Sequence, residues 1–212
     1  PLEAVDVFGN QTTQVFNVTL DTVAPNGSIN INSGATYAWG PYVQLNLTVA
    51  DSRSPITGIS LSTDGATWVT SMPYGNGVSY SLTYYNYALP LGDGTKTVYV
   101  KYSDAAGNVS AVYSKSIVLD TIIPTGSIDI NSGAAYTTSR TVTLNLLGTD
   151  LGSGIRAVRF SSDNVTWSSD KTYASSTSYT LPAGDGTKTV YVKYYDKAGK
   201  VSAVYSKSIV LD

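Results

Sequence analysis

One long stretch of the sequence occurs twice with few changes. Residues 92–120 read GDGTKTVYVKYSDAAGNVSAVYSKSIVLD, and residues 184–212 read GDGTKTVYVKYYDKAGKVSAVYSKSIVLD. Within the first copy the apolar residues Val98, Val100 and Tyr102 alternate with polar neighbours. A period of two is typical of β-strands that bury one face. The repeat therefore predicts an all-β chain of tandem sandwiches, each built from two sheets packed face to face.

The repeat divides the chain into units of about the size of an immunoglobulin-like sandwich. Asp120 follows Asp21 by 99 positions, and Asp212 follows Asp120 by 92. A unit of this length suits one sandwich of the immunoglobulin type. We therefore expect two such domains, residues 22–120 and residues 121–212.

Residues 1–21 match the end of a repeat without its beginning. Gly9 and Asn10 take the positions of Gly107 and Asn108, so we expect the last two strands of a preceding domain. A two-stranded hairpin alone is marginal in water. The missing strands are expected either from residues that precede the hairpin in a longer chain or from another chain by strand addition.

A short linker that ends in proline opens each domain, at residues 21–25 and 120–124. Proline fixes its own φ and pushes the preceding residue towards an extended backbone. The joints are therefore predicted to be short and stiff, so that successive domains form a rod.

Composition excludes several classes of function. Charged residues make up 13% of the chain and the net charge is −2, so no basic surface for nucleic acid is expected. Cysteine and histidine are both absent, which removes disulfides, zinc sites and Ser-His-Asp or Cys-His catalysis. No apolar run approaches the roughly 20 residues that span a bilayer, and no signal peptide opens the chain, so direct membrane insertion is not expected.

A tryptophan follows a turn in each copy. Trp68 comes after Asp64-Gly65, and Trp167 comes after Asp163-Asn164. Asp-Gly between alternating strands predicts a two-residue hairpin turn with positive φ. Both tryptophans are predicted to fill the cores, with a domain interface or a ligand contact as the alternatives.

The first copy carries aromatic residues that the second lacks: Trp39, Tyr42, Tyr84, Tyr85 and Tyr87. Three interpretations remain open for this group. The side chains are buried in an enlarged core or against the next domain, they form an exposed patch for another chain, or they stack on the rings of a carbohydrate.

The motif Asp-x-Ala-Gly-Asn at 104–108, followed by a strand that ends in Asp-Thr-x-x-Pro at 120–124, resembles the tandem bacterial immunoglobulin-like repeats of large secreted and cell-surface proteins. The resemblance covers the whole chain. It implies seven-stranded sandwiches without the inter-sheet disulfide, used as a stalk, spacer or adhesive module.

In a sandwich of this topology the linker enters at the same end as two of the loops that carry aspartates. Two clusters are expected, the first Asp21, Asp51 and Asp104, and the second Asp120, Asp150 and Asp196. Carboxylates with backbone carbonyls suit Ca²⁺, which is the one candidate cofactor, and related surface repeats resemble cadherins in stiffening joints this way. The alternative is that the aspartates only cap turns. Lys197 and Lys200 weaken the metal interpretation at the second cluster.

Two Asn-x-Ser/Thr sequons fall in predicted turns, at Asn108 and Asn164, and are candidate glycosylation sites. Catalysis is not expected, because Glu3 is the only glutamate and the aspartates recur in both copies.

The sequence therefore predicts a non-catalytic, extracellular or cell-surface stalk, whose first partners are the neighbouring domains of the same chain. The alternatives are a filament subunit that another copy or a surface protein completes, and an accessory module that binds carbohydrate.

Overall fold

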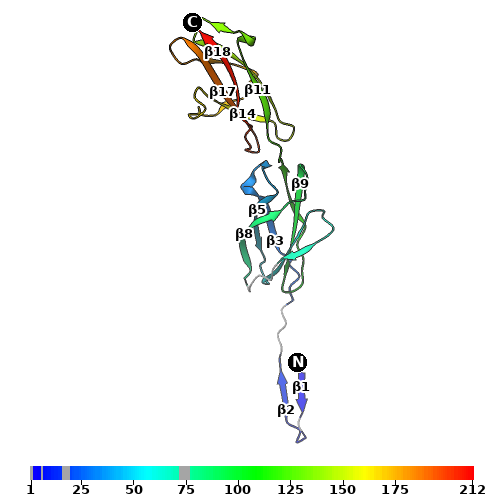
Figure 1. Ribbon diagram of the computed structural model, residues 1–212. Helices are drawn as coiled ribbons and strands as arrows, with labels where there is room; N and C mark the ends of the chain where they lie inside the picture. Colours follow the sequence, from blue (N-terminus) through cyan, green and yellow to red (C-terminus); the bar gives the residue numbers. More distant parts are fainter. Residues whose placement is uncertain (1, 6, 16–19, 72–76) are drawn as a thin grey trace.

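The computed structural model describes residues 2–5, 7–15, 20–71 and 77–212, and these residues form an all-β structure with no α-helix. Two β-sandwiches follow one another along the chain, and a two-stranded hairpin lies beyond the first of them (Figure 1). The predicted fold class is confirmed. Among the described residues, no helix has the length and hydropathy that crossing a bilayer requires.

The first sandwich packs a three-stranded sheet on a five-stranded one. The smaller sheet has the order β3-β5-β8, with bounds Asn26–Ile31, Tyr42–Ala50 and Ser79–Ala88. The larger has the order β4-β10-β9-β6-β7, with bounds Tyr37–Ala38, Tyr113–Leu119, Gly94–Asp104, Ile56–Ser62 and Val69–Ser71. The short edge strands β4 and β7 bring the total above the seven strands that the resemblance implies.

The second sandwich repeats this arrangement. Its three-stranded sheet has the order β11-β13-β16, with bounds Thr125–Ile130, Thr141–Thr149 and Ser176–Thr180. Its five-stranded sheet has the order β12-β18-β17-β14-β15, with bounds Tyr136–Thr137, Tyr205–Leu211, Gly186–Asp196, Ile155–Ser161 and Lys171–Thr172. A 3-10 turn follows the first strand in each copy, at Asn32–Gly34 and Asn131–Gly133.

The hairpin consists of β1 (Leu2–Val5) and β2 (Gln11–Gln14), which pair antiparallel. Val5 and Val15 are exposed. Completion of this hairpin by further strands stays a prediction.

Each core is filled from the faces that alternation predicts. On β9 the side chains of Val98, Val100 and Tyr102 are fully buried, while their neighbours along the strand are only partly buried. The Tyr102 hydroxyl crosses the core and donates a hydrogen bond to the carbonyl of Ser28 at 2.7 Å. The ring lies over Gly27, where any side chain would collide with the ring and with the Thr48 carbonyl.

The second core uses the same device. The hydroxyl of Tyr194 donates to the carbonyl of Ser127, and Gly126 leaves the space for the Tyr194 ring. The two sheets of each sandwich are thus tied by a buried tyrosine that passes from one sheet to the other.

The core assignment of Trp68 and Trp167 is wrong. Both rings are half-buried and lie on the outer face of the five-stranded sheets. The Lys101 ammonium lies 4.3 Å from the centre of the Trp68 ring, and that of Lys193 lies 4.2 Å from Trp167. A cation over an aromatic face is favourable at an exposed site, and each lysine stem covers apolar surface.

The turns before these tryptophans are also not of the predicted two-residue type. Only Gly65 has a positive φ in the first turn, and only Asn164 in the second. The aspartate side chain builds each turn instead. The Asp163 carboxylate accepts the backbone N–H groups of Val165 and Thr166, both at 2.8 Å, and these bonds lower the pKa of Asp163 to about 2.

Substitution of Gly27 by alanine tests the close approach in the first core. The added methyl group has no space, so we expect Gly27→Ala to lower the free energy of unfolding by about 1–3 kcal/mol. Gly40→Ala is the matched control, since a methyl group there meets no atom within 4 Å. Denaturant titration measures both. Equal losses for the two variants would contradict the packing described.

The depressed pKa of Asp163 predicts a pH dependence. A carboxylate whose pKa is lower in the folded state stabilises the fold above its unfolded pKa, near 4, and this stabilisation is lost as the pH falls through about 2. Wild type should therefore exceed Asp163→Asn in melting temperature at pH 5, and the gap should narrow towards pH 2. A gap that stays constant over this range would count against the assignment. Asp185→Asn serves as the control in an exposed turn.

Candidate metal centres at the two joints

The predicted aspartates gather at the ends of the sandwiches where the linkers enter. Each cluster takes one aspartate from a linker, one from the loop after the central strand of the small sheet, and one from the end of β9 or β17. In both clusters, one carboxylate oxygen from each aspartate lies within 4.8 Å of the other two. The clusters are Asp21, Asp51 and Asp104, and Asp120, Asp150 and Asp196.

At the first joint, one oxygen of Asp51 builds the turn after β5. It accepts the N–H groups of Arg53 at 2.7 Å and Ser54 at 2.8 Å, and these bonds, that of Ser54 foremost, lower the pKa of Asp51. The second oxygen of Asp51 is buried and accepts no hydrogen bond among the described residues. Asp51 itself is 7% exposed.

The other two aspartates of the first joint are held by neighbours. The Ser54 hydroxyl donates to Asp21. The Asn108 side-chain amide donates to the second oxygen of Asp104 at 2.9 Å and to the main-chain carbonyl of Asp21 at 3.2 Å. A single neutral amide therefore ties the linker to the end of β9.

At the second joint, the linker residue Asp120 contacts both sandwiches. Its N–H donates to the carbonyl of Ala38 in the first sandwich at 2.9 Å. Its carboxylate accepts the N–H of Ser153 in the second sandwich at 2.7 Å. Gly152 leaves space for this carboxylate, which a side chain at that position would enter.

Asp150 and Asp196 complete this cluster, and each uses only one oxygen for hydrogen bonds. Asp150 accepts the N–H groups of Ser153 and Gly154, while Asp196 accepts those of Gly199 at 2.6 Å and Lys200 at 2.8 Å. The second oxygen of both is buried and without a hydrogen-bond donor among the described residues. Asp196 is fully buried, and this burial, together with the charges of Asp120 and Asp150, raises its pKa.

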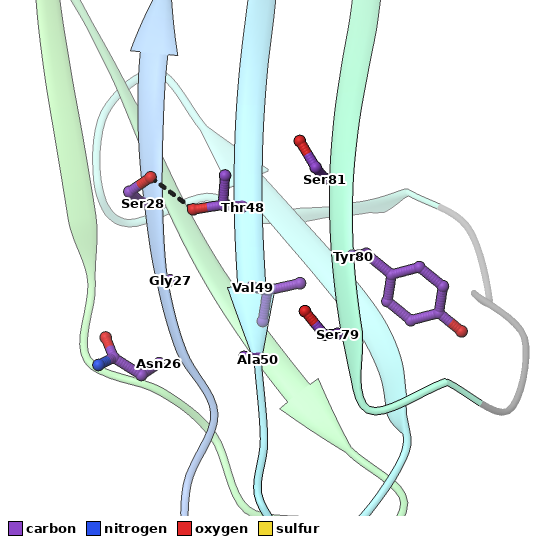
Figure 2. Close-up of a pocket in the computed structure, with 9 residues that line it drawn as sticks. All are labelled: Asn26, Gly27, Ser28, Thr48, Val49, Ala50, Ser79, Tyr80 and Ser81. Carbon is purple, nitrogen blue, oxygen red and sulfur yellow. Dashed lines mark hydrogen bonds between the residues drawn. The ribbon is translucent and has the colours of Figure 1, made fainter.

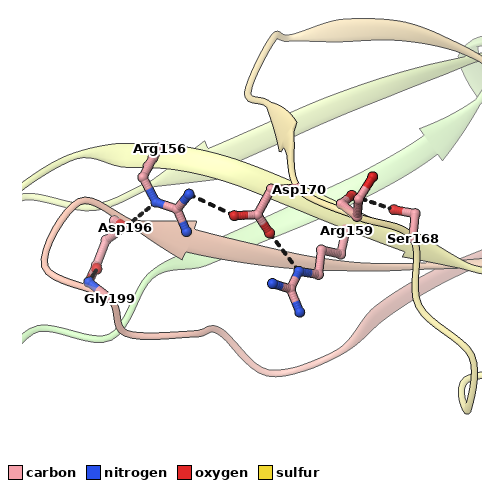
Figure 3. A network of polar contacts seen from close by, with 7 residues as sticks. Arg156, Arg159, Ser168, Asp170, Asp196 and Gly199 are labelled. Carbon is pink, nitrogen blue, oxygen red and sulfur yellow. Dashed lines mark hydrogen bonds and ion pairs between the residues drawn. The ribbon is translucent and has the colours of Figure 1, made fainter.

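The carbonyl of the strand-ending aspartate is held from the outer face in both copies. In the first, the hydroxyl of Thr57 donates to the Asp104 carbonyl at 2.8 Å. In the second, Arg156 donates to the Asp196 carbonyl at 3.4 Å and pairs with Asp170 at 2.7 Å (Figure 3). These bonds hold the main chain at the end of β9 and β17, from which the third carboxylate of each cluster extends.

The turn-capping interpretation describes one oxygen of these side chains, and the metal interpretation stays a prediction that concerns the other. One oxygen of Asp51, Asp150 and Asp196 caps a turn, as the turn-capping alternative states. The opposite oxygen of each has no donor in the part of the chain that the structure describes, although a buried carboxylate without a partner is costly. Three close carboxylates of one charge also repel one another. An oxygen-rich, anionic and partly desolvated cluster of this kind fits a hard divalent cation such as Ca²⁺.

A contact of Trp39 with the next domain, which is one of the open interpretations of the aromatic group, lies beside the second cluster. The Lys200 ammonium lies 5.9 Å from the centre of the Trp39 ring, so a side chain of the second sandwich meets one of the first. Trp39 is 70% exposed and directly follows Ala38, the residue that Asp120 contacts. The sequence signal for this contact is a tryptophan that only the first copy carries, while its partner Lys200 is not indicated by the sequence.

The remaining aromatic residues do not form one surface. Tyr42 is exposed, whereas Tyr84 and Tyr87 are half-buried against the first core, with ring centroids 6.2 Å apart. These two rings line a pocket of about 270 Å³ with Leu61 and Val69. The side chain of Tyr85 lies outside the described residues.

The two candidate glycosylation sites differ in whether the asparagine side chain is held by other residues. Asn108 uses its side-chain nitrogen for two hydrogen bonds within the first joint, and a glycan on that nitrogen would disturb both. Asn164 is exposed in its turn, and its modification stays a prediction.

A shallow groove of about 500 Å³ lies on the outer face of the β3-β5-β8 sheet (Figure 2). Its described lining combines hydroxyl and amide side chains with the apolar Val49 and Ala50 and includes no charged side chain. The hydroxyls of Ser28 and Thr48 form a hydrogen bond of 2.7 Å there. Its chemistry suits neutral, hydroxyl-bearing ligands.

Comparison with known proteins supports the fold. A scan against protein-family models finds no match, and a search of the curated proteins finds none either. The chain is similar to a solved structure from a 1.5-MDa bacterial ice-binding adhesin studied for host cell surface retention, with 17% identity and a TM-score of 0.51 over 91% of this chain and 65% of that one.

Two further solved structures are similar at lower TM-scores. The fibronectin(III)-like modules of Clostridium thermocellum CbhA share 13% identity at a TM-score of 0.49, over 87% of this chain and 94% of that one. A tetra-tandem repeat in the extending region of a large adhesion protein shares 18% at 0.36, over 99% and 55%.

Replacement of Asp196 by asparagine tests the repulsion within the second cluster. With divalent cations removed, Asp196→Asn takes away one of three close negative charges and keeps an oxygen for the turn, so we expect an unchanged or higher melting temperature. Asp185→Asn, at an exposed turn, should have no effect. A clear loss of stability in chelator would contradict the description of the cluster as strained by like charges.

Proposed function

We propose that the chain is a non-catalytic extracellular spacer, part of a cell-surface stalk or adhesin, whose sandwiches are held in a fixed succession by joints that bind Ca²⁺. The observation that carries this proposal is the double attachment of Asp120. Its main chain is bonded to the first sandwich and its carboxylate to the second. A cation shared by Asp120, Asp150 and Asp196 would therefore tie the two sandwiches directly.

The first cluster supports the same role. Asp21 belongs to the linker that precedes the first sandwich, and Asp51 and Asp104 belong to that sandwich. The same arrangement of three aspartates at both linkers is expected of a repeated structural joint. A single catalytic site would not require a second copy of it. The absence of histidine and cysteine from the sequence agrees with a non-catalytic role.

A bound Ca²⁺ ion would neutralise the negative charge of the carboxylates and would be coordinated by several of their oxygens. The residues that would hold it are the three aspartates of each cluster, through the oxygens left over from turn capping. The surface location is proposed on the fold, which this chain shares with part of a bacterial adhesin.

Two other roles are kept as second candidates. Assembly into a filament is favoured by the exposed apolar side chains of the β1–β2 hairpin. Carbohydrate binding is favoured by the neutral groove of Figure 2. Open-ended polymers of the purified chain in size-exclusion chromatography would favour the filament, and specific binding on a glycan array would favour the sugar module.

Calcium titration of the full chain tests the proposal. A ligand that binds only the folded state stabilises it, by about 2.7 kcal/mol at a concentration 100 times its dissociation constant. We expect Ca²⁺ to raise the melting temperature and to narrow the distribution of shapes in small-angle X-ray scattering. The combined variant Asp51→Asn, Asp150→Asn should lose both responses. The absence of any response of the wild type to Ca²⁺ or to chelator would overturn the proposal.

A further inference from the structure

The two joints carry the same aspartates but differ at several neighbouring positions, where the first has Arg53 and Ala105 and the second has Gly152 and Lys197. A further difference lies four residues after the strand-ending aspartate of each copy, where Asn108 at the first joint corresponds to Lys200 at the second. Both main-chain N–H groups donate to that aspartate, Asn108 to Asp104 and Lys200 to Asp196, each at 2.8 Å. Both side chains therefore start at the edge of their cluster.

The chemistry of the two side chains is opposite with respect to a cation. The Asn108 amide is neutral, and its nitrogen already contacts the first cluster. An amide oxygen is also a ligand that Ca²⁺ accepts, so rotation of this side chain by half a turn would present a further oxygen. Lys200 offers no oxygen, and its positive charge repels a divalent ion.

The second cluster has carboxylate oxygens that could accept hydrogen bonds from an ammonium group. The second oxygens of Asp150 and Asp196 accept no hydrogen bond among the described residues, whereas the corresponding oxygen of Asp104 is bonded to Asn108. In the structure, the Lys200 ammonium lies over the Trp39 ring of the first sandwich instead. The half-buried Lys200 thus has the ring as its partner in the structure, and the carboxylates of the same joint are the anionic alternative.

Trp39 is the aromatic partner of Lys200, and only the first copy carries a tryptophan at this position. The second copy has Thr138 at the matching place, in the sequence Tyr136-Thr137-Thr138 against Tyr37-Ala38-Trp39. An aromatic face attracts an ammonium group. It offers Lys200 a position away from the carboxylates, and that position lies on the neighbouring sandwich.

We propose that the two joints bind Ca²⁺ with different affinities, the first more tightly, and that Lys200 sets the difference by competing with the ion for the carboxylates of the second joint while Trp39 holds the displaced ammonium. As the Ca²⁺ concentration falls, the second joint therefore empties first. This inference rests on the proposed function, since it assumes that the clusters bind a cation at all.

Calorimetric titration with Ca²⁺ separates the two sites. In the full chain, Asp51→Asn with Asp104→Asn leaves only the second site, and Asp150→Asn with Asp196→Asn leaves only the first. We expect the remaining first site to bind roughly tenfold more tightly than the remaining second site, because one unit charge near a divalent ion changes the affinity by about this factor. Circular dichroism confirms that each variant is folded.

Exchange of the two residues gives matched variants. In the background with only the second site, Lys200→Asn should tighten Ca²⁺ binding roughly tenfold. In the background with only the first site, Asn108→Lys should weaken it by a similar factor. Trp39→Ala should weaken the second site and leave the first unchanged, and Trp39→Phe, which keeps an aromatic face, should restore most of the loss.

The outcomes distinguish the two levels of the proposal. No Ca²⁺ binding by the wild type would overturn the proposed function together with this inference. Binding at both joints with equal affinity, or second-site affinity that Lys200→Asn leaves unchanged, would overturn the inference and leave the proposed function standing. An unchanged second site in Trp39→Ala would remove Trp39 from the mechanism.

Discussion

The joint between the two sandwiches depends on a carboxylate that belongs to both of them. The main chain of Asp120 is bonded to Ala38, and its side chain enters the turn of the next sandwich beneath Ser153. The linker has few residues and a proline, so little freedom remains between these two attachments. The orientation of one sandwich relative to the next therefore follows from a small number of hydrogen bonds and from the charge of the cluster around Asp120.

The internal architecture of each sandwich delivers the other two carboxylates to that point. Asp150 lies in the turn after β13, and Asp196 ends β17, the long strand whose tyrosine Tyr194 ties the two sheets. Rigid strands place both residues, and turn capping orients one oxygen of each. One oxygen of each lies within 4.8 Å of an oxygen of the other aspartates, at a cost in charge repulsion that is typical of functional sites more than of cores optimised for stability.

Most of the fold could be predicted from the sequence because a period of two and a repeat are both explicit in it. The buried faces of β9 and β17, the positions of the linkers and the grouping of the aspartates all follow from alternation and topology. The tryptophans were placed wrongly because alternation says which face a strand residue takes, whereas Trp68 and Trp167 lie after turns, where a lysine from a neighbouring strand decides their position. The aromatic group was divided because Tyr42 and Tyr87 lie on opposite faces of one sheet. Packing of Trp39 against the next domain is among the interpretations, but its partner Lys200 could not be predicted, since no periodicity encodes the relative orientation of two sandwiches.

The proposed joints require a cation between the carboxylates, and anomalous X-ray scattering from crystals grown with Ca²⁺ observes such an ion most directly. We predict an anomalous peak at each joint, with carboxylate oxygens of Asp120, Asp150 and Asp196 at about 2.3–2.6 Å from the peak at the second joint. Crystals that show both clusters ordered at high Ca²⁺ concentration, with no peak between the aspartates of either, would contradict it.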